Sequence, residues 1–448
     1  MDLMKRKNGI HFYINIKNFD KVVTNEEMTS KSVNHSIHAL DTFFSSIEKY
    51  GKKKYKDIFT VEKITGARLH MYVTDEILSA YKCVETIAVY AYQLSKLVNK
   101  EIPKYKSLTD FQIQIGASYG DFYEFVFQYN NGNLTPYEEI TTIGYAANYA
   151  AKLQGLASAS SICVSEDIYN ECKLDDRLFL KCKDKKIEKY GQDCFYKANL
   201  NSLAEDVMIT AEELDIVKDY ANKVNLTDMD FSEVRKNLSF ANLSKTNCKK
   251  ITGVALFADV RGFTAKFKED DSNLEQMTIE TEQLLTEMYN VTSQSHGIHV
   301  QFQGDREEVL FQDNEESKCY EVAVIAGMRM IDAIKCKNVH IGIGTDYGTL
   351  YAARIGAHGE KDNILIGSTV INADKLEDEN AGEDQIAISE TIYNGLVDIK
   401  SSLVKFFNKD TNGTYIATIG YKDYLSEMAS IKHRESTRSK NYNGAWRA

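Results

Sequence analysis

The chain has 448 residues, of which 43% are hydrophobic and 11% aromatic, and its formal net charge is −11. This length predicts two or three packed domains, and the acidic charge gives no support for general nucleic-acid binding, which usually needs a basic patch. No apolar run approaches the ~20 residues that cross a bilayer, the N-terminus lacks the apolar stretch of a secretory signal, and the cysteines form no CxxC pair. We therefore expect a cytoplasmic protein with free thiols and no direct membrane insertion.

The chain contains the same domain twice, in residues 8–198 and 250–420. Each copy has, in the same order, a strand-like first segment, a glycine-led segment, a landmark glycine and a segment that contains Ser-Glu. These are 10–16, 116–120, Gly144 and 164–170 in the first copy, and 254–260, 344–348, Gly367 and 388–394 in the second. Such an internal repeat predicts two large domains of one fold.

Short β-branched segments alternate with helical patterns in both copies. The second copy predicts a helix over 273–291, a hairpin over 301–311 that turns at Gly304-Asp305, and a strand over 341–343. This alternation favours an α/β or α+β sandwich with one sheet per copy. Residues 199–249 are expected to be a helical linker with a packed helix over 211–220, and 421–448 a polar tail that is basic and frayed over 432–440.

The two copies differ at two positions that could carry chemistry. When the landmarks are overlaid, Asp259 falls on Asn15 and Asp305 falls on Ala67. Each aspartate follows an apolar strand, so the two carboxylates are expected at adjacent strand ends, where oxygen ligands suit Mg²⁺ or Mn²⁺. Two ordinary turn aspartates are the alternative, which their joint loss from the first copy weakens.

Residues 257–264, Phe-Ala-Asp-Val-Arg-Gly-Phe-Thr, and 302–305, Phe-Gln-Gly-Asp, resemble the metal-binding signature of class III nucleotidyl cyclases. The resemblance covers both copies. It implies an α+β fold of two tandem sandwich domains with βαββαβ cores, packed head to tail as an intramolecular pseudo-heterodimer. It also implies two Mn²⁺ or Mg²⁺ ions, with Asp259, Val260 and Asp305 as metal residues, and substrate binding by Gly262, Phe263 and Thr264.

The same resemblance assigns the transition-state residues to the first copy. They are Asn148 and Lys152, which stand four and eight residues after Gly144. Many members of the family have arginine where this chain has Lys152, so the positive charge is kept but the bidentate fork is lost. The second copy has Ile371 and Lys375 at these offsets.

One complete site and one inactive pocket follow from this distribution. The inactive pocket is expected to contain Asn15, Ala67 and Ile371. At the complete site, the implied reaction is attack of the ribose 3′-oxygen on the α-phosphorus with loss of pyrophosphate. Asn148 would orient the ribose, and Lys152 would neutralise charge on the α-phosphate. Arg261, Arg306 and Arg354 could add phosphate contacts, although structural roles are favoured for all three.

The resemblance assigns base reading to Lys63 and Thr141, a pair that resembles some adenylate cyclases. The same donor and acceptor could also read cytosine or uracil, whereas guanine is expected to need a glutamate. A bare tandem cyclase resembles the pyrimidine cyclases of bacterial antiphage (Pycsar) systems, whose cyclic nucleotide activates a separate effector protein. By this analogy UTP is favoured over CTP and ATP, with cyclic UMP as a second messenger in antiphage defence.

Three other functions stay open on the sequence alone. The chain could be a cytidylate or adenylate cyclase, which differs only in the base. It could be a catalytically dead nucleotide-binding regulator, although such a protein need not keep both aspartates. A two-metal phosphodiesterase is weakened by the lack of a His-rich cluster in the sequence.

Overall fold

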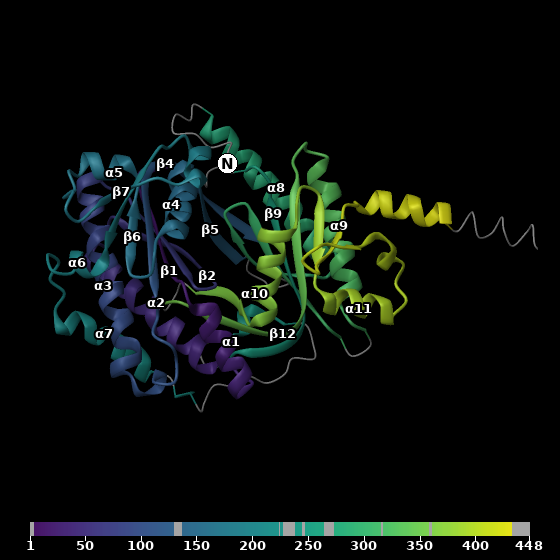
Figure 1. Ribbon diagram of the computed structural model, residues 1–448, viewed down its shortest axis with the longest axis horizontal. Coiled ribbons are helices and arrows are strands. Elements are labelled where there is room, and N and C mark those ends of the chain that lie inside the picture. Colours follow the sequence, from purple (N-terminus) through teal and green to yellow (C-terminus); the bar gives the residue numbers. More distant parts are fainter. Residues whose placement is uncertain are drawn as a thin grey trace, which may run out of the picture.

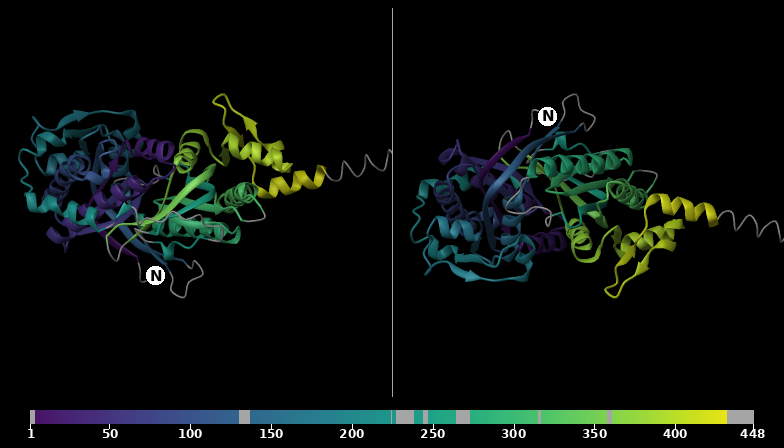
Figure 2. Two further views of the ribbon diagram at one scale, coloured as in Figure 1. Left: turned by 90° about the horizontal axis from the view of Figure 1, so that it is seen from below. Right: turned by 90° about the horizontal axis from the view of Figure 1, so that it is seen from above.

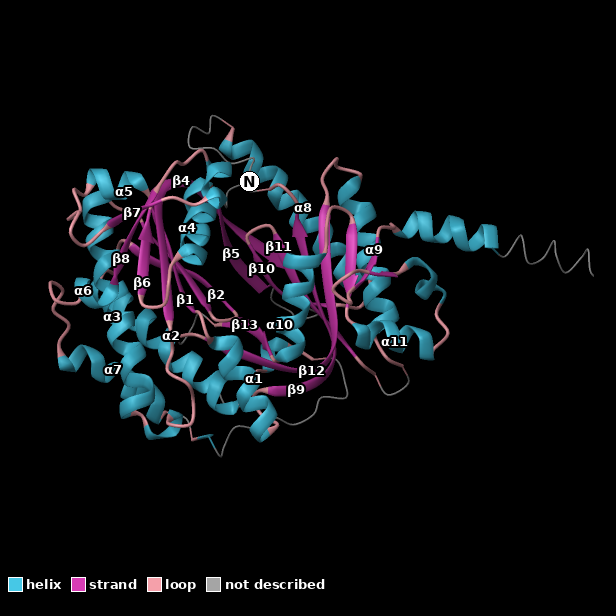
Figure 3. Ribbon diagram, in the orientation of Figure 1, coloured by secondary structure: helices cyan, strands magenta, loops and turns pink. Residues whose placement is uncertain are grey.

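The computed structural model describes residues 4–129, 137–223, 225–226, 238–243, 247–263, 273–314, 317–357 and 361–431. Two sheets of the same topology lie side by side along the long axis of the molecule, each covered by helices (Figures 1, 2 and 3). None of the helices described in these ranges is long and apolar enough to cross a membrane. All eight cysteines are free thiols, as expected.

The first sheet has the strand order β2-β3-β1-β4-β6-β8-β7, and β5 pairs with β4. Its strands are β1 (Lys5–Ile16), β2 (Phe59–Thr65), β3 (Arg68–Val73), β4 (Ile113–Tyr129), β5 (Tyr137–Ile143), β6 (Ser161–Val164), β7 (Leu180–Cys182) and β8 (Phe195–Asn199). The helices are α1 (Phe19–Ser30), α2 (Asn34–Lys54), α3 (Ile77–Glu101), α4 (Tyr145–Leu156), α5 (Glu166–Glu171) and α6 (Leu200–Leu203).

The second sheet repeats this order as β10-β11-β9-β12-β14-β16-β15, with β13 paired to β12. Its strands are β9 (Lys249–Val260), β10 (Ile298–Gln303), β11 (Arg306–Gln312), β12 (Ile341–Ile355), β13 (Asp362–Ile366), β14 (Gln385–Ile388), β15 (Asn408–Lys409) and β16 (Tyr415–Ala417). The helices are α8 (Leu274–Gln294), α9 (Tyr320–Lys335), α10 (Ser368–Lys375) and α11 (Glu390–Asp398). The predicted α+β fold with a βαββαβ core in each copy is confirmed.

Local sequence signals account for several of these elements. The predicted helix over 273–291 is α8, whose N-cap is Asn273. The predicted linker helix is α7 (Ala211–Asn222), which begins with a capping box between Thr210 and Glu213 and packs against α2 and α3. Residues 421–431 form a further helix, and the predicted basic segment 432–440 lies outside the described residues.

Two glycines allow the corresponding helices α4 and α10 to pack closely against their sheets. A Cβ atom on Gly116 would lie 2.1 Å from the backbone nitrogen of Gln154 at the end of α4. A Cβ atom on Gly344 would lie 2.4 Å from the carbonyl oxygen of Ala373 in α10. Because only glycine permits this approach, it is the packing of these two helices that explains the glycine-led landmark of each copy.

The two copies exchange strands across their interface. The β4 residues Phe125, Phe127 and Tyr129 belong to the hydrophobic core of the second copy. In return, the far end of β12 and the strand β13 pack into the core of the first copy through Tyr351, Ala353, Ile355, Ile364 and Ile366. This explains why β12 continues to Ile355, well beyond the predicted 341–343, since its extension is stabilised by the other copy.

Carboxylates of each copy also accept hydrogen bonds from the backbone of the other. Glu139 of β5 accepts the N–H of Phe302 in β10 at 2.8 Å, and Asp362 of β13 accepts the N–H of Ile64 in β2 at 2.7 Å. Glu139 and Asp362 occupy equivalent positions, five residues before the landmark glycines. The two bonds are therefore a reciprocal pair, related by the pseudo-twofold arrangement of the copies.

We predict that Phe127→Ala destabilises the whole chain by about 3–5 kcal/mol, as buried phenylalanine truncations do. Phe127 is 5% exposed, and its ring centroid lies 4.8 Å from that of Phe302 in the other copy. Chemical denaturation followed by circular dichroism measures the loss. Met28→Ala is the control, because Met28 is 70% exposed and should change stability by no more than about 0.5 kcal/mol. Similar losses in both variants would contradict the exchanged core.

A second prediction concerns Glu48 of α2, which accepts the N–H of Ala357 across the interface at 2.6 Å. Burial raises the pKa of Glu48 from 4.5 to about 8. The stability that the protonated carboxyl provides is therefore complete below pH 4.5 and is lost as the pH rises toward 8. Glu48→Gln mimics the neutral form, so its thermal unfolding temperature should fall less than that of the wild type over this range. Parallel pH profiles would refute the assignment.

Candidate active site

The two predicted aspartates lie together at one end of the second sheet. Asp259 is the penultimate residue of β9 and stands opposite Arg306, the first residue of β11. Asp305 precedes Arg306 in the turn between β10 and β11, where Gly304 adopts the left-handed φ of +68° that the turn requires. Burial, followed by the charge of Asp259, raises the pKa of Asp305 well above its usual range. The two carboxylates therefore repel one another, which a shared cation would relieve.

Arginines near the aspartates are held by other carboxylates of the second copy. Arg261 Nη1 lies 2.7 Å from Glu377 Oε1 and 3.4 Å from Asp259 Oδ2. Arg306 Nη2 lies 2.5 Å from Asp374 Oδ1, and its guanidinium stacks over the ring of Phe257. These contacts favour the structural roles predicted for both residues. The carboxylate oxygens of Asp259 and Asp305 are hard donors of the kind that Mg²⁺ and Mn²⁺ take.

The segment after β9 contains the other residues predicted to contact metal or substrate. Val260 ends β9 and is buried, with its backbone paired to Ile341 of β12. Gly262 has a left-handed φ of +70°, and no atom of the described residues lies within 4 Å of the position that its Cβ would take. Phe263 is 3% exposed and packs into the core of the second copy, where it also lines a cavity of about 260 Å³. Thr264 lies outside the described residues.

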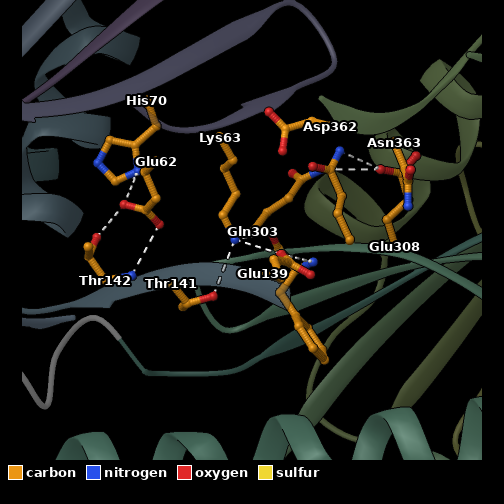
Figure 4. A network of polar contacts seen from close by, with 12 residues as sticks. Glu62, Lys63, His70, Glu139, Thr141, Thr142, Gln303, Glu308, Asp362 and Asn363 are labelled. Atoms are coloured by element: carbon orange, nitrogen blue, oxygen red, sulfur yellow. Dashed lines mark hydrogen bonds and ion pairs between the residues drawn. The ribbon is translucent and has the colours of Figure 1, made fainter. Parts of the chain in front are cut away.

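The predicted base-reading pair lies at the boundary between the copies. Lys63 Nζ donates to Thr141 Oγ1 at 3.3 Å, to Glu139 Oε1 at 2.7 Å and to the carbonyl oxygen of Phe302 at 3.0 Å (Figure 4). Lys63 and Thr141 therefore come from the first copy but lie against β10, the strand that leads to Asp305. The structure brings this pair and the metal hairpin into contact, and Lys63 is buried.

A second polar network lies beside this pair and was not predicted. Glu62 accepts the N–H of Thr142 at 3.1 Å and also its hydroxyl, and Glu62 Oε2 lies 2.7 Å from His70 Nδ1 (Figure 4). His70 Nε2 lies 2.9 Å from His11 Nδ1. Burial opposes ionisation of Glu62, but the neighbouring His70 charge lowers its pKa to about 2. Ligand atoms of His11, Glu62 and His70 lie within 4.8 Å of one another, as in a metal site, but both nitrogens of His70 are already hydrogen bonded.

The predicted transition-state residues lie on α4 of the first copy. Asn148 and Lys152 are four residues apart and therefore share one face of the helix. The Asn148 Nδ2 atom is buried and has no hydrogen-bond partner among the described residues. An unpaired buried amide is costly, and such groups in native structures require an explanation, which a bound ligand can supply.

The predicted inactive pocket is present as a cavity of about 270 Å³ between the copies. Its lining includes Asn15 and Ala67 of the first copy and Ile371 of the second, as the sequence predicted. These three residues are the positional equivalents of Asp259, Asp305 and Asn148. Because the two copies have the same topology, the convergence of these positions on one side supports the same convergence on the other.

Comparisons with known proteins agree with the fold. No family model matches the sequence. A uridylate cyclase of Pseudomonas aeruginosa is 22% identical over 423 residues, which cover 87% of this chain and 78% of that protein. The crystal structure of a class III adenylyl cyclase-like ATP-binding protein from the same organism superposes with a TM-score of 0.70 and 19% identity, over 95% of this chain and 91% of that one. The resemblance to tandem class III cyclase-like proteins is thereby confirmed.

Sequence reasoning missed the buried acids around Lys63 and Thr141. Glu139 precedes Thr141 by two residues, so both side chains lie on one face of β5, and Glu62 adjoins Lys63 in β2. The signal available in the sequence was a charged residue, Glu139, at a spacing of two from the predicted site residue Thr141 on the same strand. No such signal existed for His299 of β10, because one of its partners, Glu139, belongs to the other copy and is distant in sequence.

Proposed function

We propose that this chain is a nucleotidyl cyclase that converts a nucleoside triphosphate into a 3′,5′-cyclic nucleotide and pyrophosphate. The observation that carries the proposal is the carboxylate pair Asp259 and Asp305, present in only one of two otherwise equivalent sheets. A structural role would give no reason to keep two repelling carboxylates in one copy alone. The relative that is named a uridylate cyclase supports the same activity.

In this proposal each group has a role that follows from its chemistry. Asp259 and Asp305, with the backbone of Val260, would hold two divalent cations, which would lower the pKa of the attacking hydroxyl and neutralise charge on the triphosphate. Asn148 orients the ribose through the amide that has no partner in the described structure. Lys152 neutralises charge that grows on the α-phosphate. The backbone N–H groups of the segment that begins with the exposed Gly262 would contact phosphate.

We propose UTP as the substrate, ahead of CTP and ATP. The support is the curated relative, which is named a uridylate cyclase and aligns with 87% of this chain. Lys63 and Thr141 would then contact the base. By the same analogy, cyclic UMP would act in antiphage defence in the cytoplasm through a separate effector protein. The structural relative is named an ATP-binding protein, which keeps adenylate cyclisation and nucleotide sensing as alternatives to be tested.

A pyrophosphate-release assay with Mn²⁺ and each of the four nucleoside triphosphates tests the activity and the base. UTP should be turned over fastest, and Asp305→Asn and Asn148→Ala should each lower the rate by about 10²-fold or more, as loss of a transition-state contact does. Ile371→Ala, which alters the cavity on the opposite side, should change the rate by less than about twofold. Binding of a nucleotide without turnover would replace the cyclase proposal with the regulator.

Thermal unfolding with and without Mn²⁺ tests the metal residues independently of turnover. Mn²⁺ should raise the unfolding temperature of the wild type, because it binds the folded state alone. Asp305→Asn should unfold at a higher temperature than the wild type in the absence of metal, since it removes the repulsion, and should not respond to Mn²⁺. Asp20→Asn in the opposite cavity should keep the metal response. An unchanged response in Asp305→Asn would place the metal elsewhere.

A further inference from the structure

The peptide group of Phe302 is held on both sides by an ion pair from the other copy. Its N–H donates to Glu139 Oε1 at 2.8 Å, and its carbonyl oxygen accepts from Lys63 Nζ at 3.0 Å. Glu139 and Lys63 are themselves 2.7 Å apart, with side chains that are 11% and 3% exposed. A buried ion pair of this kind is stabilised only when its remaining donors and acceptors are satisfied, and here the backbone of β10 satisfies them.

Glu139 holds the second half of the hairpin as well. Its other oxygen, Oε2, lies 3.3 Å from His299 Nε2 in β10, and His299 Nδ1 lies 2.8 Å from Glu307 in β11. Burial opposes a charge on His299, but hydrogen bonds to Glu139 and Glu307 raise its pKa to about 9. A chain of polar contacts thus runs from Lys63 through Glu139 and His299 to Glu307, and reaches both strands that flank Asp305.

This network also determines what Lys63 can do. An ammonium group has three donors, and those of Lys63 are engaged by Glu139, Thr141 and Phe302. A base that takes a hydrogen bond from Lys63 must therefore displace one of these acceptors. Two of these three bonds hold strand β10. A change in the hydrogen bonds of Lys63 therefore alters the contacts of Phe302, which stands three residues before Asp305.

The equivalent contact on the opposite side of the interface is much simpler. Asp362 accepts the N–H of Ile64 at 2.7 Å, but Gln301 stands where the first copy has Lys63. Gln301 donates to Glu308 within its own copy. The hairpin that Asp362 touches carries Ala67 in place of an aspartate. Among the contacts between the copies, the larger network therefore involves the hairpin with the carboxylate, and the bond from Ile64 to Asp362 involves the hairpin without it.

We propose that Glu139 is a positioning residue that fixes Lys63 and the Asp305 hairpin together, so that base recognition by one copy is coupled to metal binding by the other. This inference rests on the proposed cyclase function for its catalytic consequences. Its structural part, the fixing of the hairpin by Glu139, does not depend on the reaction.

The test compares Glu139→Gln with Asp362→Asn in the full chain. Both variants neutralise a carboxylate that binds the other copy's backbone, so they are matched in size and location. Glu139→Gln should weaken Mn²⁺ binding and lower kcat by about 10- to 100-fold, as loss of an outer-shell partner of a metal site does. It should also reduce the ratio of kcat/KM for UTP to that for CTP. Asp362→Asn also removes a group whose charge acts on Lys63, but it leaves the Phe302 peptide group held, so it should lower Mn²⁺ binding and kcat much less than Glu139→Gln does.

Hydrogen exchange provides a readout that does not require turnover. Glu139→Gln should increase amide exchange at least tenfold in the peptide that covers Phe302 to Arg306, whereas Asp362→Asn should do so around Ile64. Glu139→Asp keeps the charge and should restore part of the Mn²⁺ affinity, which also covers the case in which Glu139→Gln does not fold. Equal effects of Glu139→Gln and Asp362→Asn on metal binding and exchange at the Asp305 hairpin would overturn the inference. The expected exchange pattern without turnover of any triphosphate by the wild type would overturn the proposed function alone.

Discussion

The structure depends on the reciprocal hydrogen bonds by which each copy binds the backbone of the other. Glu139 accepts from Phe302 and Asp362 accepts from Ile64, and both carboxylates lie where the exchanged strands enter the opposite core. Hydrophobic packing alone is tolerant of small shifts in register, whereas a carboxylate bonded to one particular amide is not. The apolar contacts therefore supply most of the stability of the interface, and these two bonds define its alignment.

The same fold serves different ends in the two copies because divergence is confined to a few positions. Sheet order, hairpins and the glycines that allow close packing of α4 and α10 are common to both. What differs is the charge placed on this scaffold. The second copy carries Asp259 and Asp305. The first copy carries Lys63 and the face of α4 with Asn148 and Lys152. Burial of so many charged groups opposes folding, and we interpret their retention as evidence that they act together.

Much of this arrangement could be predicted from the sequence. The repeat, an α/β or α+β class, the helix at α8 and the turn at Gly304 follow from periodicity and landmark glycines. The cavity with Asn15, Ala67 and Ile371 is what the resemblance to class III cyclases implies. The length of β12 could not be predicted, because its far end is stabilised by the core of the first copy, which is distant in sequence. His299 was missed for the same reason, because its partner Glu139 is distant in sequence. Glu139 itself could have been found, because it stands two residues before Thr141 on the same face of β5.

The exchange of strands within one polypeptide has a consequence for how such a molecule behaves in dilute solution. Two separate subunits with this interface would dissociate as their concentration falls, and any cleft between them would be lost. Here the linker through α7 keeps the partners at a high effective concentration. Assembly is thereby converted into a folding step, and a single molecule per cell retains its complete cleft.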